Sequence, residues 1–427
     1  MATIYIENFG PVQRAEIDLN KKFQIIIGPQ ASGKSTVCRV AYFCRKIRDY
    51  IIQFISDPDL LINGHPSEAS TNLKKYLAKQ FMGCFGTTKH MRLFYLRYAF
   101  GSHSITITLK NGYVRFFFTR ALNVQMDQII HEAIDLYHDN NFAFMTMKEI
   151  LNQNSLLRQQ ITKRIQTLFD DDSDIIYIPA GRSVLATMSE QLQDIPLFSM
   201  DLTMQEFISR IRETRQNFGV SLPDVVQNYV KTVKGQINNT AVNLAIAKIK
   251  DILKADYTSD KDGEKLYYDD THWVKLLYAS SGQQESLWVL LPCFLQILHK
   301  QKSFIVIEEP EAHLFPDAQR SMVELIALMM RATSSNVMLT THSPYVLTSA
   351  NILVYAGSIE KQISKVNAVI DSGVRIHPED FAGYSIEDGC LQDIFNREAH
   401  MMDAEYIDQI STAINKELDE LLEIENA

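Results

Sequence analysis

Residues 28–35, GPQASGKS, could do chemistry on a phosphate, because they fit the spacing G-x-x-x-x-G-K-[ST] at every fixed position. Glycines at this spacing let main-chain N–H groups curl around phosphate oxygens, the lysine reaches the β and γ phosphates, and the last hydroxyl binds Mg²⁺. The apolar run 23–27 predicts a strand before the loop, and residues 36–47 predict a helix whose N-terminus faces the anion. A glycine turn with a helix cap is the weaker alternative.

Glu308 and Glu309 form a second pair that could do chemistry. They follow the unbroken apolar run 304–307, which is typical of a buried central strand, and so stand where that strand ends. Ligands of an open α/β sheet bind at that edge, and two carboxylates are costly to place there without a purpose. We therefore expect both acids to serve the phosphate loop, and a helix at 317–331 to follow them.

Two more polar groups stand at the ends of predicted elements. His342 follows an apolar strand at 336–339, so we expect it at the same sheet edge as the two glutamates. Ser281 begins a predicted helix, and the spacing S-x-x-Q from Ser281 to Gln284 predicts a capping box. The same serine and the free N–H groups of a helix start could instead hold a phosphate, which would suit a nucleotide bound by another subunit.

Arg182 follows a predicted strand at 175–178 and stands in a loop of proline and glycine. It could lie near a phosphate, or it could cap a surface turn, and the sequence favours neither interpretation. The basic clusters at 45–48, 158–164 and 210–215 are typical of solvated helix faces.

Composition indicates a globular chain. Its 427 residues are 46% hydrophobic with a net charge of −9, which allows a large core and two or three domains and argues against a chain wrapped throughout in nucleic acid. Its 5 cysteines lack metal-ligand spacing and suit a reduced cytosol. Residues 1–20 show no secretory apolar region, and the tract 287–298 is too short to cross a bilayer, so we expect a cytoplasmic protein without membrane contact.

Other segments must position these groups. Alternating apolar residues predict a hairpin at 3–7 and 12–19, three strands between 92 and 119, and a later strand at 351–355. Between 121 and 264 the pattern is mostly helical without a sustained heptad run, which indicates a compact helical subdomain. Apolar spacing predicts an acidic helix at 401–426 that packs on the body or on a partner.

Four motifs stand in a fixed order along the chain: GPQASGKS, SSGQQ, IVIEEPEAHLFP and TTHSP. This set resembles the ABC, SMC and RecF type of AAA-family ATPase, and is most similar to the ATPases of OLD-like and Septu-type bacterial anti-phage systems. The resemblance implies an α/β fold, namely a P-loop ABC-type ATPase head with a parallel core sheet, an antiparallel side lobe and a compact helical insertion.

The resemblance covers the ATPase halves, roughly 1–45 and 265–355, and together with the sequence patterns it leads us to expect four units. Residues 1–120 would form the N-terminal half of the ATPase head, and 121–264 a mainly helical insertion that includes strand 175–178. Residues 265–358 would form the C-terminal half of the head, and 359–427 a partly helical tail.

Roles follow from the same resemblance. Glu308 matches the Walker B acid and joins Ser35 on Mg²⁺, Glu309 resembles the general base, and His342 the switch histidine on the γ-phosphate, with Lys34 absorbing charge. Ser280 and Gln283 depart from the usual signature L-S-G-G-Q. The residues implied to hold ATP are Gly28, Pro29, Gln30, Ala31, Ser32, Gly33, Lys34, Ser35, Thr36 and, toward the opposing subunit's nucleotide, Ser281, Gly282 and Gln284.

The implied activity is hydrolysis of ATP to ADP and phosphate with Mg²⁺, in a homodimer that clamps two ATP molecules. The implied role is that of a sensor or regulator in anti-phage defence, which controls a separate effector such as a nuclease. Two alternatives stay open. One is a RecF-like DNA-repair ATPase whose basic helical insert binds DNA or RNA, and the other is a slow-hydrolysing, nucleotide-locked scaffold, suggested by the altered signature.

Overall fold

The computed structural model of the chain describes residues 2–62, 69–88, 91, 93–139, 147–182, 185, 200–215, 218, 220–233, 237–260, 263–359 and 363–403. Apart from residues 401–403, the acidic helix expected at 401–426 lies outside these ranges. Within them, no helix combines the length and the apolar character that crossing a membrane requires.

An 11-stranded sheet runs through the body in the order β6-β5-β4-β1-β2-β14-β13-β3-β12-β11-β7. Strands β13, β3, β12, β11 and β7 pair in parallel, whereas β6, β5, β4, β1 and β2 pair antiparallel. This confirms the expected parallel core sheet and antiparallel side lobe. The strands are β1 (Ala2–Phe9), β2 (Val12–Asp18), β3 (Phe23–Ile27), β4 (Tyr95–Phe100), β5 (His103–Lys110), β6 (Tyr113–Phe118), β7 (Asp174–Ile178), β11 (Ser303–Glu308), β12 (Asn336–Thr340), β13 (Phe381–Glu387) and β14 (Cys390–Asp393).

Helices cover both faces of the parallel strands, which explains why these strands are apolar throughout. Ile305 and Ile307 of β11 belong to one hydrophobic core, and Phe304 and Val306 belong to the other. The first core contains α9 (Asn239–Leu253), α10 (Ser281–His299), α11 (Pro316–Thr333) and α12 (Pro344–Ser358). The second contains α1 (Lys34–Ser56), α3 (Ala69–Phe85), α4 (Arg120–Asp139) and α5 (Met147–Phe169).

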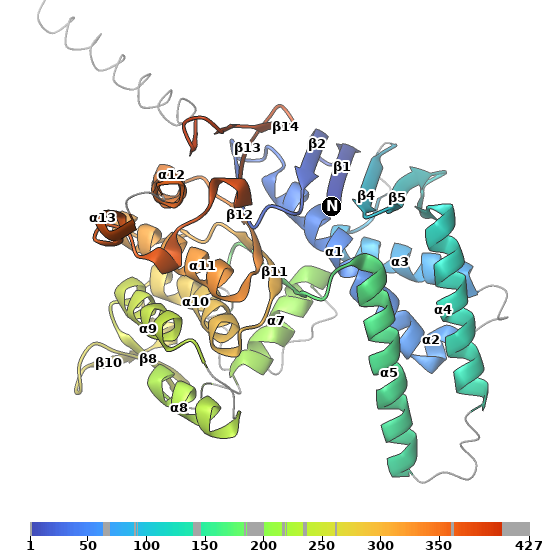
Figure 1. Cartoon of the computed structure of the whole chain (residues 1–427), viewed down its shortest axis with the longest axis horizontal. Helices are drawn as coiled ribbons and strands as arrows, with labels where there is room; N and C mark the ends of the chain where they lie inside the picture. Colours follow the sequence, from blue (N-terminus) through green and yellow to red (C-terminus); the bar gives the residue numbers. More distant parts are fainter. Residues whose placement is uncertain are drawn as a thin grey trace, which may run out of the picture.

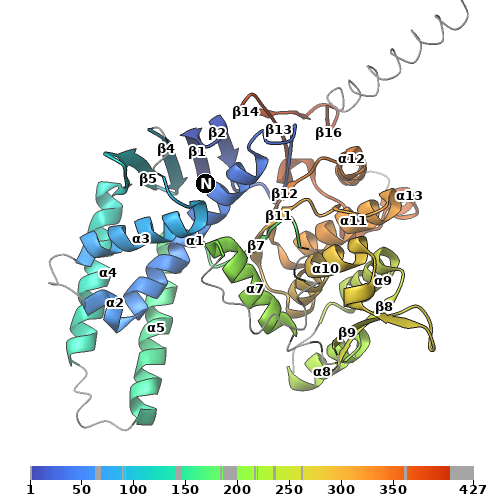
Figure 2. The same cartoon turned by 180° about the vertical axis from the view of Figure 1, so that it is seen from behind.

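The segment between β6 and β10 is mainly helical. Its first two helices, α4 and α5, are joined by an ion pair between Arg164 and Glu132, and they project together from the body (Figures 1 and 2). Strand β7 then returns to the main sheet beside β11. The remaining elements of the segment are α7 (Leu202–Arg215), α8 (Leu222–Thr232), α9, β8 (Asp256–Asp260), β9 (Gly263–Tyr267) and β10 (Trp273–Lys275).

The structure differs from the sequence-based expectation at two places after β12. The predicted strand at 351–355 is wrong, because these residues lie inside α12, which Ser343 caps and Pro344 begins. Strand β13 was not predicted, yet it pairs in parallel with β3, where Phe381 lies opposite Phe23. The chain beyond α12 therefore supplies a strand of the central sheet next to the phosphate loop.

Candidate active site

The loop between β3 and α1 has a main-chain shape that only glycine allows at two positions. Gly28 and Gly33 have φ values of 150° and 111°, which side chains rarely adopt. A Cβ at Gly28 would lie 2.5 Å from the carbonyl oxygen of Ile386, and one at Gly33 would lie 2.9 Å from a methyl of Val12. Tight packing against β13 and β2 therefore shapes the loop that holds Lys34 at the start of α1.

The Lys34 side chain folds back over this loop. Its Nζ donates hydrogen bonds to the carbonyl oxygens of Gly28 at 2.9 Å and Pro29 at 2.8 Å. Burial lowers the pKa of Lys34, and the nearby Glu309 carboxylate opposes that effect. The Lys34 ammonium thus lies against the main chain of the loop. It is close enough to Glu309, which follows a different strand, for the two charges to interact.

Hydroxyl groups of the loop fit a phosphate and a magnesium ion. Ser32 Oγ is buried without a hydrogen-bond partner, so it has bonding capacity to offer a phosphate oxygen. Ser35 is exposed at the start of α1. The remaining loop positions differ in exposure: Pro29, Gln30 and Ala31 are exposed, and Thr36 is half-buried.

Glu308 ends β11 with a buried carboxylate. One oxygen accepts a hydrogen bond from the Tyr177 hydroxyl at 2.7 Å, and the other accepts one from the Ala180 N–H at 3.1 Å. Burial raises the pKa of Tyr177 well above its usual value, so this hydroxyl remains a donor. Each carboxylate oxygen keeps a lone pair for a metal or its water.

Oxygen ligands in this arrangement suit Mg²⁺. Within the described ranges no group of three or more His, Cys, Asp or Glu residues could hold a metal by itself. Magnesium in phosphate-transfer sites uses one or two carboxylates together with the substrate's own phosphates. Ser35 and Glu308 would be the protein's share of such a set.

Glu309 and His342 lie together beyond the ends of β11 and β12. Their side chains approach to 3.3 Å between His342 Nε2 and Glu309 Oε1, and both are 40% exposed. Glu309 has a left-handed φ of 45°, and its N–H donates to the Thr340 carbonyl at 3.0 Å. Glu309 and His342 therefore lie at the same edge of the sheet, as expected from the sequence.

Ser280 caps helix α10, so the capping box predicted at Ser281 and Gln284 is wrong by one residue. The Ser280 side chain accepts from the Gln283 N–H, and the Gln283 side chain accepts from the Ser280 N–H. Ser281 is thereby released from capping and lies exposed at the helix start. Gln284 instead braces the preceding turn, where its Nε2 donates to the carbonyls of Leu277 and Ala279.

The starts of α10, α11 and α12 gather at the carboxyl edge of the sheet. Gly282 lies against the main chain of His313, and the Ser343 hydroxyl donates to Gln319 Oε1 at 2.5 Å. These contacts bring the signature segment beside the turn that follows Glu309. In the described part of the chain, no hydrogen bond or ion pair links Ser281 or Gln284 to residues 28–36.

Replacing Gly282 by Ala is expected to lower the free energy of unfolding by about 1–3 kcal/mol. The added Cβ would lie 2.6 Å from the carbonyl oxygen of His313, so α10 and the turn must move apart. Gly83, inside α3, is the matched control, because its Cβ would meet Leu202 at an ordinary 3.5 Å. Gly83→Ala should raise the unfolding free energy by about 0.4–1 kcal/mol. Denaturant unfolding measures both changes, and a stabilised Gly282→Ala protein would contradict the close approach.

The sequence analysis did not identify Glu311 as a site residue, and it left two interpretations of Arg182 open. Glu311 is buried, and one of its oxygens accepts from the Thr341 hydroxyl at 2.6 Å and the His342 N–H at 3.0 Å, while the other has no partner. Burial raises its pKa. Arg182 is fully buried and donates to main-chain carbonyls, so it does not belong to a surface turn. For Glu311, the only signal in the sequence was that an acidic residue stands three positions after Glu308.

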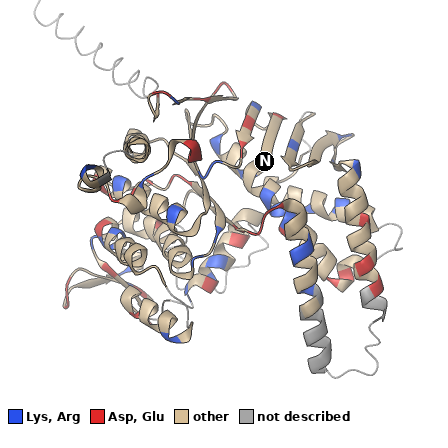
Figure 3. Ribbon diagram, in the orientation of Figure 1, with Lys and Arg blue, Asp and Glu red and all other residues tan. Residues whose placement is uncertain are grey.

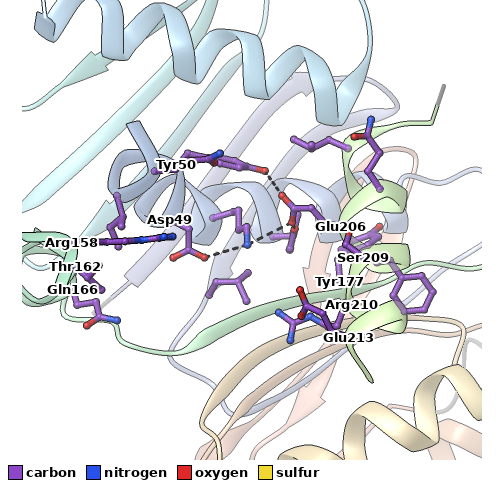
Figure 4. Close-up of a pocket in the computed structure, with 18 residues that line it drawn as sticks. Asp49, Tyr50, Arg158, Thr162, Gln166, Tyr177, Glu206, Ser209, Arg210 and Glu213 are labelled. Atoms are coloured by element: carbon purple, nitrogen blue, oxygen red, sulfur yellow. Dashed lines mark hydrogen bonds and ion pairs between the residues drawn. The ribbon is translucent and has the colours of Figure 1, made fainter. Parts of the chain in front are cut away.

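A separate polar cavity of about 630 Å³ lies between α1, α5 and α7 (Figure 4). Glu206 accepts hydrogen bonds there from the hydroxyls of Tyr42 and Tyr50. Tyr177 also lines the cavity, but no residue of the phosphate loop does. The cavity is therefore distinct from the candidate active site, and among the described residues the hydrogen bond from Tyr177 to Glu308 links the two.

Residues 1–347 match a family model described as an AAA ATPase domain. None of the curated proteins matches the sequence. Among solved structures, the chain is similar to an SMC head bound to the C-winged helix domain of ScpA, with 11% identity and a TM-score of 0.39 over 92% of this chain and 96% of that one. An SMC head domain from Thermotoga maritima has 11% identity and a TM-score of 0.37 over 92% and 97%.

A further similar structure is an Smc head domain with an extended coiled coil, bound to the C-terminal domain of ScpA derived from Pyrococcus furiosus. Its identity is 12% and its TM-score 0.36, over 97% of this chain and 100% of that one. Likeness at this level carries no argument about activity or partners.

Proposed function

The chain belongs to the AAA ATPase domain family, and on that premise we propose that it binds ATP with Mg²⁺ and hydrolyses it to ADP and phosphate. The observation that carries the proposal is the position of Lys34, Glu309 and His342 beyond the ends of the adjacent parallel strands β3, β11 and β12, with Glu309 and His342 3.3 Å apart. Purified protein is expected to release phosphate from ATP only when Mg²⁺ is present. A protein that binds ATP and Mg²⁺ without releasing phosphate would instead support the nucleotide-locked scaffold.

The loop would bind the triphosphate through its N–H groups and Lys34. An anionic phosphate is a better acceptor for the lysine than the neutral carbonyls of Gly28 and Pro29 that it now contacts, so the ammonium would turn toward it. Ser32 would satisfy its unpaired hydroxyl on the same group. Ser35 and Glu308 would hold Mg²⁺, which neutralises phosphate charge when bound.

Glu309 would orient the attacking water and take its proton. Its carboxylate is 40% exposed and lies 3.3 Å from His342, so water can reach the base. His342 would contact the γ-phosphate from the other side. As the water oxygen bonds to phosphorus, the bond to the ADP oxygen breaks, and Lys34 offsets the negative charge that develops.

We further propose that two copies close around two nucleotides. Ser281 stands exposed at the positive end of α10 without a bond to its own phosphate loop, so a second subunit's phosphate suits it. Large aromatic side chains flank the motifs on this edge: Tyr278 is 77% exposed, Phe315 75% and Tyr345 52%. Exposed aromatics of this kind are enriched at protein interfaces. Gly282 would allow close approach, and Gln284 would brace the segment.

For the cellular role, we propose a sensor or regulator of a bacterial anti-phage defence system, with opening and closing of the dimer controlling a separate effector such as a nuclease. The motif resemblance to OLD-like and Septu-type ATPases supports this role. Affinity capture of the natively expressed protein, in cells whose neighbouring genes are intact, should recover the effector. Recovery of the protein alone would count against the role.

DNA binding by the helical insertion is the second candidate function. Arg158 and Lys163 are exposed on α5, which projects from the body and whose ribbon is marked by several basic residues (Figure 3). Phosphate contacts by such residues predict an affinity that falls steeply with salt. If duplex DNA at low salt neither binds nor changes the rate of phosphate release, this candidate fails.

A further inference from the structure

The Arg182 guanidinium lies at the junction of three elements that carry the active site. It is 0% exposed. Nη1 donates to the carbonyl oxygens of Pro179 and Glu308, both at 2.7 Å, and Nη2 donates to that of Glu309 at 2.9 Å. Nε donates to the carbonyl of Glu285 in α10 at 3.3 Å. One side chain thus joins the loop after β7, the end of β11 and the start of α10.

These contacts are unusual for a buried cation, because the acceptors are main-chain carbonyls. No described carboxylate forms an ion pair with Arg182, although acidic side chains surround it. Burial lowers its pKa, and Glu285, Glu311, Glu308 and Glu309 oppose that effect. A buried charge is costly unless its hydrogen bonds are well made, so the geometry of this junction is strongly determined.

The contact with Glu309 fixes an otherwise unfavourable turn. Glu309 has a φ of 45°, a conformation that costs energy for a residue with a side chain. Thr340 accepts from its N–H, and Arg182 donates to its carbonyl, so both peptide groups of Glu309 are held. The position of the carboxylate beside His342 depends on this turn.

We propose that Arg182 is a positioning residue that holds Glu309 where it can orient the water that attacks the terminal phosphate, and that ties Glu309 to α10. This inference rests on the proposed ATPase function and deepens it. Because Glu285 lies one turn after Ser281, a shift of the α10 start on closing around a second nucleotide would reach Glu309 through the same guanidinium. In this proposal Arg182 acts through main-chain carbonyls and has no direct contact with the phosphate or the attacking water.

Arg182→Lys is the first test, because lysine keeps the charge but cannot bridge several carbonyls at once. We expect kcat for ATP hydrolysis to fall by about 10–100-fold, as for a base displaced by about 1 Å. The KM for ATP and the equilibrium affinity should stay within about twofold, because the phosphate loop is untouched. Arg182→Gln, which removes the charge, should likewise lower kcat and leave the KM for ATP nearly unchanged.

Arg48→Lys is the matched control. Arg48 is also buried, at 3% exposed, and donates to the carbonyls of Asp171 and Ser173, but it contacts none of the proposed catalytic groups. Its replacement should lower thermal stability and leave kcat unchanged. If Arg48→Lys lowers kcat as much as Arg182→Lys does, general destabilisation explains the loss of rate in both variants, and the inference is overturned.

A double substitution separates positioning from any other role. If Arg182 acts through Glu309, then Arg182→Lys should cause no further loss of rate in a Glu309→Gln background. The inference is overturned by an unchanged kcat, by equal losses in both backgrounds, or by loss of ATP binding in both Arg182 variants. A wild-type protein that does not hydrolyse ATP would overturn the proposed function itself, so the two failures are distinguishable.

Discussion

Replacing Glu309 by Gln is expected to slow ATP hydrolysis by about 10²–10⁴-fold, the usual contribution of a general base. The amide keeps the size of the side chain but cannot take a proton from water. Lys34, Ser32 and the loop N–H groups are untouched, so ATP and Mg²⁺ should bind as tightly as in the wild type. Phosphate release under single-turnover conditions and equilibrium binding of a fluorescent ATP analogue measure the two quantities separately.

The same variant should accumulate as an ATP-bound dimer, since hydrolysis is the step that reopens the proposed clamp. Light scattering after size exclusion, with and without ATP and Mg²⁺, reports the mass. Glu398→Gln is the control, because Glu398 is an exposed carboxylate away from the parallel strands. The Glu398→Gln protein should hydrolyse ATP at the wild-type rate. Its proportions of monomer and dimer should also equal those of the wild type. A Glu309→Gln protein that stays monomeric at saturating ATP would refute the clamp.

Replacing Lys34 by Ala is expected to weaken ATP binding by at least about 10²-fold, since each hydrogen bond to a charged group contributes about 1.5–3 kcal/mol. The lysine ammonium is the only cation that the phosphate-loop segment 28–35 offers. Loss of the side chain also removes the Lys34 hydrogen bonds to the carbonyls of Gly28 and Pro29, of which Pro29 still accepts from the Ser32 N–H. Binding would be undetectable at micromolar nucleotide.

Lys46→Ala is the matched control for this substitution. Lys46 lies further along the same helix and pairs with Asp49 and Glu206, in the wall of the separate cavity. Its removal should leave ATP affinity within about twofold of the wild type. Titration calorimetry with ATP and Mg²⁺ compares the two. Equal affinity of Lys34→Ala and wild type would place the nucleotide somewhere other than this loop.

The sequence predicted the parallel strands other than β13 well, because burial on both faces leaves a continuous apolar run and little ambiguity. Runs at 23–27, 304–307 and 336–339 all became central strands. The run at 351–355 looked the same over five residues, and periodicity cannot separate a short buried strand from part of a buried helix. The cap at Ser343 and the proline after it decided in favour of the helix.

Pairing partners distant in sequence were beyond prediction. Strand β13 has a glycine and a serine in its middle, and its place beside β3 depends on contacts with a segment more than 350 residues earlier. The prediction of the helix cap in the signature segment was wrong for a different reason. The spacing S-x-x-Q fits both Ser280 with Gln283 and Ser281 with Gln284. Only the helix start in the structure distinguishes the two, and it leaves Ser281 exposed.

Side chains that bind main-chain atoms are the hardest to assign from a sequence, because their partners need no particular residue type. Arg182 contacts carbonyls, which every residue has, so no spacing rule could have found its partners. Glu311 supports the main chain of His342 in the same way. By contrast, a phosphate loop needs particular residue types at fixed spacing, and for that reason the sequence predicts one at residues 28–35.

The central claim is that Lys34, Glu308, Glu309 and His342 act on one ATP molecule and one magnesium ion. A crystal structure of the Glu309→Gln protein grown with ATP and Mg²⁺ tests it most directly. The account predicts a γ-phosphate beside Lys34 and His342, a metal near Ser35 and Glu308, and Ser281 of a second copy facing the same nucleotide. Nucleotide density on another face of the protein, away from the ends of β3 and β11, would contradict it.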